Sequence, residues 1–96
     1  MDIWLAMLIV LAEKQGVSPQ SITLRVQNDI LKEYIARGTY IFPPKPSVSV
    51  ATDVITYCTQ HYPHWFPLTA CGYHIREAGA NAPQEIAFTI ANAITY

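Results

Sequence analysis

Two strand-like segments, each followed by a polar step and then by helical sequence, most constrain the fold of this chain. Residues 21–27 alternate with period two, placing Ile22, Leu24 and Val26 on one face, which predicts a strand. Residues 68–73 are predicted to form a second strand. Because strands that alternate with helices pair in parallel, the sequence predicts an α/β unit.

Local signals predict helices before and between these strands. Residues 1–12 are the most apolar run, and Gly16 suits the left-handed position that follows a helix. After the first strand, either Asn28 or Asp29 would cap a helix that starts at Ile30. That helix is expected to end near residues 37–38, since Gly38 can adopt a positive φ.

Prolines divide the second half of the chain. Three of them make residues 39–46 a predicted loop, because proline fits neither helix interiors nor central strands. A helix is predicted over about residues 50–62, capped by Ser47 or Ser49 and stopped by Pro63. A turn at residues 79–82 precedes a last helix, for which Pro83 suits the first position.

Length and charge limit the function classes. Ninety-six residues make one small domain, and a net charge of −1 with no basic patch argues against nucleic acid. The apolar start is shorter than the ~20 residues that span a bilayer and lacks the basic residues of a secretion signal. We therefore expect a cytoplasmic chain, bound to no membrane, whose two cysteines stay reduced. A charged fraction of only 14% predicts that other protein covers part of the surface.

One spacing suggests a metal site. Cys58, His61 and His64 follow one another at intervals of three, which places neighbours on one helix face. Pro63 interrupts that helix, however, and a structural zinc site needs a fourth ligand that the sequence does not supply. We expect no metal here.

Two motifs carry a family resemblance. Residues 27–44 read QNDILKEYIARGTYIFPP and residues 72–80 read GYHIREAGA. Together they closely resemble the substrate-binding domain of adenosylcobalamin-dependent acyl-CoA mutases, the methylmalonyl-CoA mutase family, over a span from about Ala12 to Tyr96. The resemblance implies that residues 1–96 are a fragment of an acyl-CoA-binding (β/α)8 TIM barrel, with about two βα units and flanking helices. Since a full barrel needs about 250 residues, the implied partners are the rest of the barrel and a cobalamin-binding domain.

The resemblance also implies an activity. Members of the family use adenosylcobalamin to interconvert methylmalonyl-CoA and succinyl-CoA by a radical 1,2-rearrangement, and ethylmalonyl-CoA or another branched acyl-CoA is the alternative substrate. The 96-residue piece is expected to be inactive alone, because a cobalamin domain is missing from it. A second possibility is a non-catalytic protein that completes a barrel or docks on a partner subunit.

Site residues follow from the motifs. The resemblance makes His74 a catalytic residue that hydrogen-bonds the substrate thioester carbonyl, and Tyr73 a catalytic residue that crowds the adenosyl group. Gln27 and Arg37 match substrate-binding residues, Arg37 for the free carboxylate, and Glu77 matches a residue that contacts the cofactor. Polar residues at the ends of parallel strands are expected to face one barrel mouth.

Two positions depart from the family pattern. Arg25 shares strand parity with Gln27 and stands where relatives usually carry a small threonine. It either reaches a CoA phosphate or obstructs the substrate channel, and the sequence leaves both open. His64 replaces a lysine expected to help bind CoA, which removes that contact from the prediction.

Overall fold

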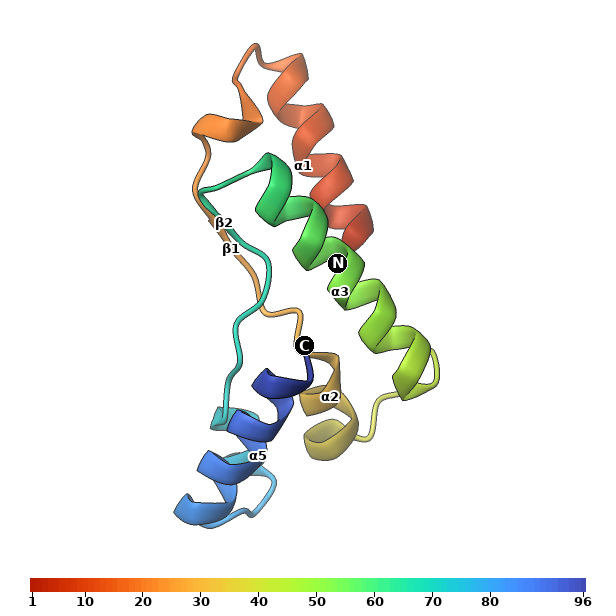
Figure 1. Ribbon diagram of the computed structural model, residues 1–96, viewed down its shortest axis with the longest axis vertical. Helices are drawn as coiled ribbons and strands as arrows, with labels where there is room; N and C mark the ends of the chain where they lie inside the picture. Colours follow the sequence, from red (N-terminus) through yellow and green to blue (C-terminus); the bar gives the residue numbers. More distant parts are fainter.

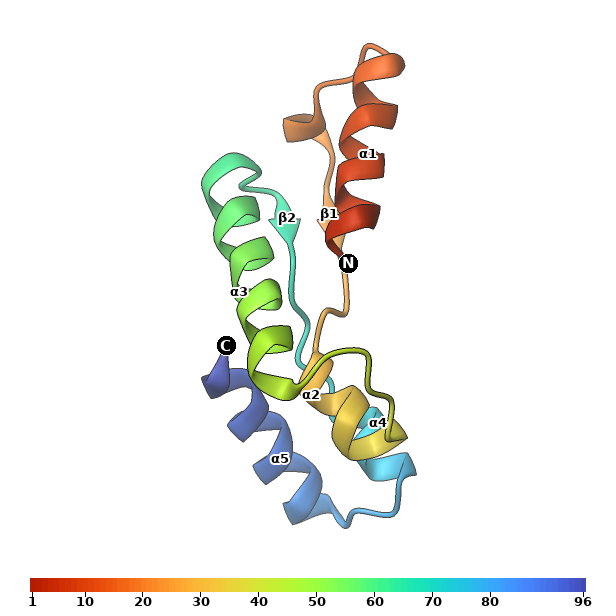
Figure 2. The same cartoon turned by 90° about the vertical axis from the view of Figure 1, so that its right-hand side faces the viewer.

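A computed structural model describes residues 1–96 as an elongated, helix-rich molecule with one short parallel sheet, 47 × 25 × 20 Å in extent. In chain order the elements are α1 (Asp2–Lys14), η1 (Pro19–Ser21), β1 (Leu24–Arg25), α2 (Ile30–Lys32), η2 (Glu33–Arg37), α3 (Pro44–His61), β2 (Trp65–Phe66), α4 (Tyr73–Glu77) and α5 (Ala82–Thr95). Helix α1 and the strands lie toward one end, and α2, η2, α4 and α5 lie toward the other, while α3 runs between them from the sheet to α2 (Figures 1 and 2). No helix is both long and apolar enough to cross a bilayer.

The two strands pair in parallel, as the alternation of strands and helices predicted. Leu24 lies opposite Trp65 and Arg25 opposite Phe66. The first strand is shorter than predicted, because only Leu24 and Arg25 of the predicted residues 21–27 form β1 and Ser21 belongs to a 3₁₀ turn. The predicted strand at residues 68–73 is wrong. Pairing occurs at β2 instead and stops before Pro67, which has no N–H to donate to a ladder.

The caps predicted from local sequence are confirmed at three helix ends. Gly16 follows α1 with φ = 68°, and Gly38 follows η2 with φ = 61°, which is the conformation that glycine tolerates best. At the start of α2, the Asp29 carboxylate accepts a hydrogen bond from the Lys32 N–H at 3.1 Å. Glu33–Arg37 forms a π-helix, a widened turn that the apolar pattern did not predict.

The two long helices of the second half begin earlier than predicted. Helix α3 starts at Pro44, so the predicted loop over residues 39–46 ends sooner, and the predicted cap at Ser47 or Ser49 is wrong because both serines lie inside the helix. Prolines fit there because the first-turn N–H groups have no intrahelical acceptor. Helix α5 has Pro83 in its first turn, as predicted, and Asn81 and Gln84 form a reciprocal capping box.

The main core lies between α1, α3 and the sheet. Its buried members are Leu5, Val54, Cys58, Tyr62 and Trp65. Only 13 of 96 residues are buried, and the radius of gyration is 15.0 Å, against about 12.5 Å for a compact domain of this length. Large apolar side chains such as Trp4, Ile41 and Ile94 are 70–83% exposed. The chain therefore forms a partial α/β unit with apolar surface left over, as the low charged fraction suggested.

Candidate functional site

Four side chains of the first motif form one polar chain across α2 and η2. The Lys32 ammonium donates to Gln27 Oε1 at 3.0 Å and lies 3.4 Å from Glu33 Oε1. The other Glu33 oxygen pairs with the Arg37 guanidinium at 3.2 Å. Two predicted substrate-binding residues, Gln27 and Arg37, are thereby connected through two residues that the sequence reasoning did not single out.

Lys32 is the unexpected member of this chain, because it is only 1% exposed. A buried ammonium is tolerated where hydrogen bonds and an opposite charge replace its water. Gln27 supplies the first and Glu33 the second. The sequence offers one hint that Lys32 is buried, because it directly follows the apolar pair Ile30 and Leu31. That hint is not sufficient, because the burial of Lys32 depends on which helices pack around it.

The cap of α2 is completed from the far end of the sequence. Asp29, which is 2% exposed, accepts a hydrogen bond from the Tyr96 hydroxyl at 3.0 Å. That hydroxyl in turn accepts from the Leu31 N–H at 3.1 Å. Burial raises the pKa of Tyr96 to about 12, and the nearby negative charge of Asp29 contributes to the rise. The phenol is thus held in its neutral, donating form.

This pair gives a prediction for alkaline pH. Replacing Tyr96 with phenylalanine is expected to lower the free energy of unfolding at pH 8 by about 1–3 kcal/mol, because it removes two hydrogen bonds, one to the buried Asp29 carboxylate and one from the Leu31 N–H. The folded-state pKa lies above the ordinary value of 10, so the stability that the phenol contributes is complete below pH 10 and is lost as pH rises towards 12. Denaturant titrations between pH 8 and 12 should show the free energies of unfolding of the parent and of Tyr96→Phe converging. Tyr40→Phe, which changes an exposed ring, should have the same free energy of unfolding as the parent at each pH. A constant gap between parent and Tyr96→Phe would contradict the assignment.

Tyr73 and His74 open α4, after an irregular segment, instead of ending a strand as predicted. Their rings meet edge to face, with centroids 5.3 Å apart and planes at 90°. Tyr73 is 61% exposed, whereas His74 is half-buried and its buried Nδ1 has no hydrogen-bond partner. Glu77 is exposed in the last turn of the same helix.

Helix α4 packs against both η2 and α5, which brings the two sequence motifs side by side (Figure 2). The contact with α5 is close at Gly72, where a Cβ atom would lie 2.6 Å from Thr89 Oγ1 and 2.8 Å from Glu85 Cγ. A glycine is therefore required for α4 to start at this point. The structure unites the segment that carries Tyr73, His74 and Glu77 with the segment that carries Arg37.

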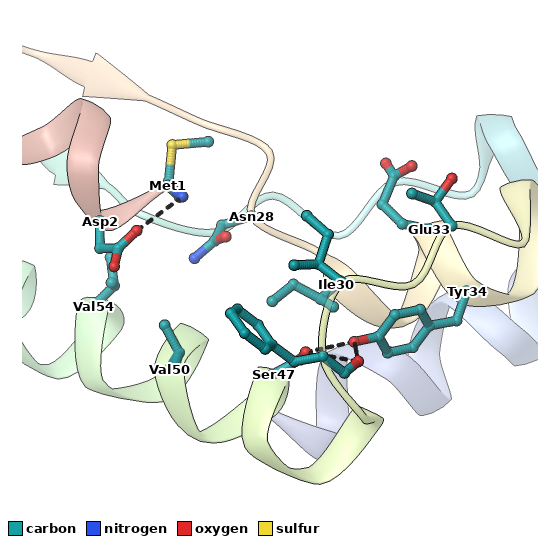
Figure 3. A pocket seen from close by; sticks show the side chains of 12 residues that line it. Met1, Asp2, Asn28, Ile30, Glu33, Tyr34, Ser47, Val50 and Val54 are labelled. Carbon is teal, nitrogen blue, oxygen red and sulfur yellow. Dashed lines mark hydrogen bonds and ion pairs between the residues drawn. The ribbon is translucent and has the colours of Figure 1, made fainter.

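A pocket of about 400 Å³ lies on the other side of the first motif, between the start of α1, the α2–η2 segment and α3 (Figure 3). Its lining is largely apolar and includes Ile30, Ile41, Phe42, Val50 and Val54. At its edge the Tyr34 hydroxyl donates to the Phe42 carbonyl at 2.7 Å and contacts Ser47 Oγ. Glu33 lines this pocket as well as pairing with Arg37, but none of the five predicted site residues does.

Arg25 occupies a defined position. Its guanidinium lies over the ring of Phe66, 4.9 Å from the centroid, and Phe66 is its partner across the sheet. Stacking of a cation on an aromatic face is favourable by about 0.5–1 kcal/mol at an exposed site. The Arg25 side chain is thus engaged within the sheet.

The cysteine of the suspected metal spacing belongs to the core. Cys58 is fully buried, and burial raises the pKa of its thiol, which disfavours the thiolate that a metal needs. His61 and His64 are exposed. Both cysteines are free thiols, although Cys71 is only half-buried and lies outside any strand.

The comparisons with known proteins agree on one family. The family model described as methylmalonyl-CoA mutase matches residues 1–96. The chain is 51% identical over 92 residues to a methylmalonyl-CoA mutase of Escherichia coli, and 48% identical over 92 residues to the mitochondrial methylmalonyl-CoA mutase of Mus musculus. It is 49% identical over 90 residues to an ethylmalonyl-CoA mutase of Cereibacter sphaeroides.

These alignments cover 94–96% of the chain but only 12–14% of the relatives. The identity is high and extends across both motifs, which the structure packs together. The chain belongs to the methylmalonyl-CoA mutase family.

Proposed function

We propose that residues 1–96 form part of the acyl-CoA-binding barrel of an isomerase that interconverts methylmalonyl-CoA and succinyl-CoA by a radical 1,2-rearrangement. The observation that carries this proposal is the packing of α4 against η2, because it joins both motifs in a chain matched by the family model throughout. In this proposal β1 and β2 are adjacent strands of a (β/α)8 barrel. The other strands and a cobalamin-binding domain come from the rest of a polypeptide or from a partner, in the cytoplasm.

The substrate is proposed to be a dicarboxylic acyl-CoA. Arg37 is exposed and its guanidinium pairs with only one carboxylate, that of Glu33. A guanidinium offers a planar fork of donors that matches a second carboxylate. Gln27, also exposed, contributes an amide that holds donors and an acceptor. Ethylmalonyl-CoA remains the alternative, since it carries the same free carboxylate.

His74 is proposed to hydrogen-bond the thioester carbonyl and to share a proton with it as the acyl group migrates. Its buried Nδ1 lacks any partner within the chain, and a buried nitrogen without one is unfavourable. A substrate carbonyl or a neighbouring group of the completed barrel would satisfy the ring. An imidazole suits this role because small changes of environment move its pKa across neutral pH.

Helix α4 is proposed to face the cofactor. Tyr73 exposes 61% of its surface beside His74, and Glu77 places a free carboxylate at the other end of the same helix. Tyr73 would press against the adenosyl group and Glu77 would contact the corrin side chains. When bound, adenosylcobalamin supplies a carbon radical through homolysis of its cobalt–carbon bond.

The proposal is tested by isolating the native assembly that contains this chain. Affinity capture from the source, intact mass spectrometry and an assay with methylmalonyl-CoA should show succinyl-CoA formation that depends on added adenosylcobalamin. Ethylmalonyl-CoA is assayed in parallel to decide between the two substrates. A pure assembly that converts neither acyl-CoA would overturn the proposal.

A non-catalytic role is the second candidate, and the exposed apolar side chains favour it. Trp4 on α1 and Ile94 on α5 are 70% and 79% exposed, which suits a segment that completes or docks on a partner. In that case the captured complex would be stable, and any activity that it has would be indifferent to the replacement of His74.

A further inference from the structure

We propose that Lys32 is a positioning residue that orients the amide of Gln27, so that Gln27 acts as a hydrogen-bond donor to acyl-CoA. This inference rests on the proposed function, which makes Gln27 a substrate-binding residue. The observation behind it is the 3.0 Å contact from Lys32 Nζ to Gln27 Oε1. Gln27 is exposed, whereas the Lys32 side chain is 2% exposed.

The chemistry of the pair fixes which end of the amide faces outward. An ammonium group has three donors and no acceptor, and a carboxamide has one acceptor oxygen and one NH₂ group. The oxygen of Gln27 must therefore face Lys32, and its NH₂ group is left free for a ligand. The matching ligand atom is an acceptor, such as the thioester carbonyl or an amide carbonyl of the CoA arm.

Lys32 is held before any ligand arrives. Its backbone N–H donates to Asp29 at 3.1 Å, and its ammonium lies between Gln27 and Glu33. A free lysine side chain loses rotamer entropy when it is fixed in one conformation. Burial within the fold has already imposed this cost, so the orientation of Gln27 is set in advance.

A purely structural role, in which Lys32 only neutralises Glu33, explains the contacts less well. Glu33 already has Arg37 at 3.2 Å, closer than Lys32 at 3.4 Å. The shortest contact of the Lys32 ammonium goes to Gln27 instead. The geometry thus assigns the lysine to the amide first and to the carboxylate second.

A double-mutant cycle in the complete mutase assembly tests this assignment. Calorimetry gives the Kd for methylmalonyl-CoA, and turnover gives kcat, for Lys32→Met, Gln27→Ala and the double variant. We expect Lys32→Met to raise Kd by up to about tenfold, the upper end of what one neutral hydrogen bond to the ligand contributes, with kcat changed less than about threefold. Once Gln27 is alanine, adding Lys32→Met should change Kd by less than about twofold, because non-additivity marks residues that act together. Lys45→Met, at an exposed lysine with no ion pair, is the matched control and should bind like the parent.

The outcomes distinguish failure of the proposed substrate site at Gln27 from failure of the role given to Lys32. If Gln27→Ala leaves Kd unchanged, the proposed site itself is wrong. If Gln27→Ala weakens binding but Lys32→Met does not, or the two effects multiply, only the role of Lys32 fails. Gln27→Glu keeps the acceptor for Lys32 and removes the NH₂ donor, so it should bind as poorly as Gln27→Ala. Parent-like binding by Gln27→Glu would overturn the donor role, and this variant leaves the buried lysine intact.

Discussion

Replacing His74 with alanine in the complete assembly is expected to lower kcat for rearrangement of methylmalonyl-CoA by about 10²–10⁴-fold, the usual effect of losing a positioned acid–base group. The Kd for the acyl-CoA should rise much less, by roughly tenfold or below, because one neutral hydrogen bond contributes about 1 kcal/mol. The physical reason is that the imidazole shares its proton with the carbonyl mainly in the transition state. Stopped-flow or steady-state assays, combined with equilibrium binding, separate the two effects.

The matched control for this variant is His61→Ala. His61 is an exposed histidine near the end of α3, outside both motifs, and its loss should leave kcat and Kd within about twofold of the parent. A His74→Ala assembly that turns over like the parent would show that His74 has no catalytic role. It would also favour the non-catalytic alternative for this chain.

Replacing Arg37 with glutamine is the second large effect that we expect. In the complete assembly the proposed pair of Arg37 with the substrate carboxylate would be buried, and removing one partner of a buried, hydrogen-bonded charge pair costs about 2–5 kcal/mol. We therefore expect kcat/KM for methylmalonyl-CoA to fall by at least about 30-fold. An acyl-CoA without the second carboxylate should lose little, because it never engaged the guanidinium fork. The fold should tolerate the change, since Arg37 is exposed and Glu33 keeps Lys32 as a partner.

The deciding measurement is therefore the ratio of kcat/KM for methylmalonyl-CoA to kcat/KM for an acyl-CoA that lacks the second carboxylate. Arg76→Gln, at an exposed arginine on α4 that forms no ion pair, serves as the control and should leave the ratio unchanged. An equal loss for both classes in Arg37→Gln would mean that the guanidinium acts on the CoA portion or on the fold, and not on the carboxylate.

Features determined by neighbouring residues could be predicted from the sequence. The left-handed glycines at positions 16 and 38 each depend on a few adjacent residues and were placed correctly. The cap of α2 was narrowed to Asn28 or Asp29, and the structure shows that it is Asp29. The parallel pairing followed from the alternation of strands and helices. The motif residues could be named from the resemblance, and their roles stay predictions.

Features that depend on residues far apart in the sequence could not be predicted. The apolar residues 68–73 match a strand locally, but a strand exists only where another backbone pairs with it, and β1 pairs with Trp65 and Phe66. Tyr73 and His74 consequently lie on a helix. The burial of Lys32 likewise depends on the packing around α2, and the link from Lys32 to Gln27 was not visible in the pattern of charges.

The hydrogen bond between Asp29 and Tyr96 also has a consequence for the order of folding. The two residues are 67 positions apart, so the cap of α2 reaches its final form only after α5 has docked. Contacts of such long sequence separation require closure of a large loop and generally slow folding. During synthesis the first motif would emerge from the ribosome well before its last hydrogen-bond partner, and its helix would mature only once residue 96 is available.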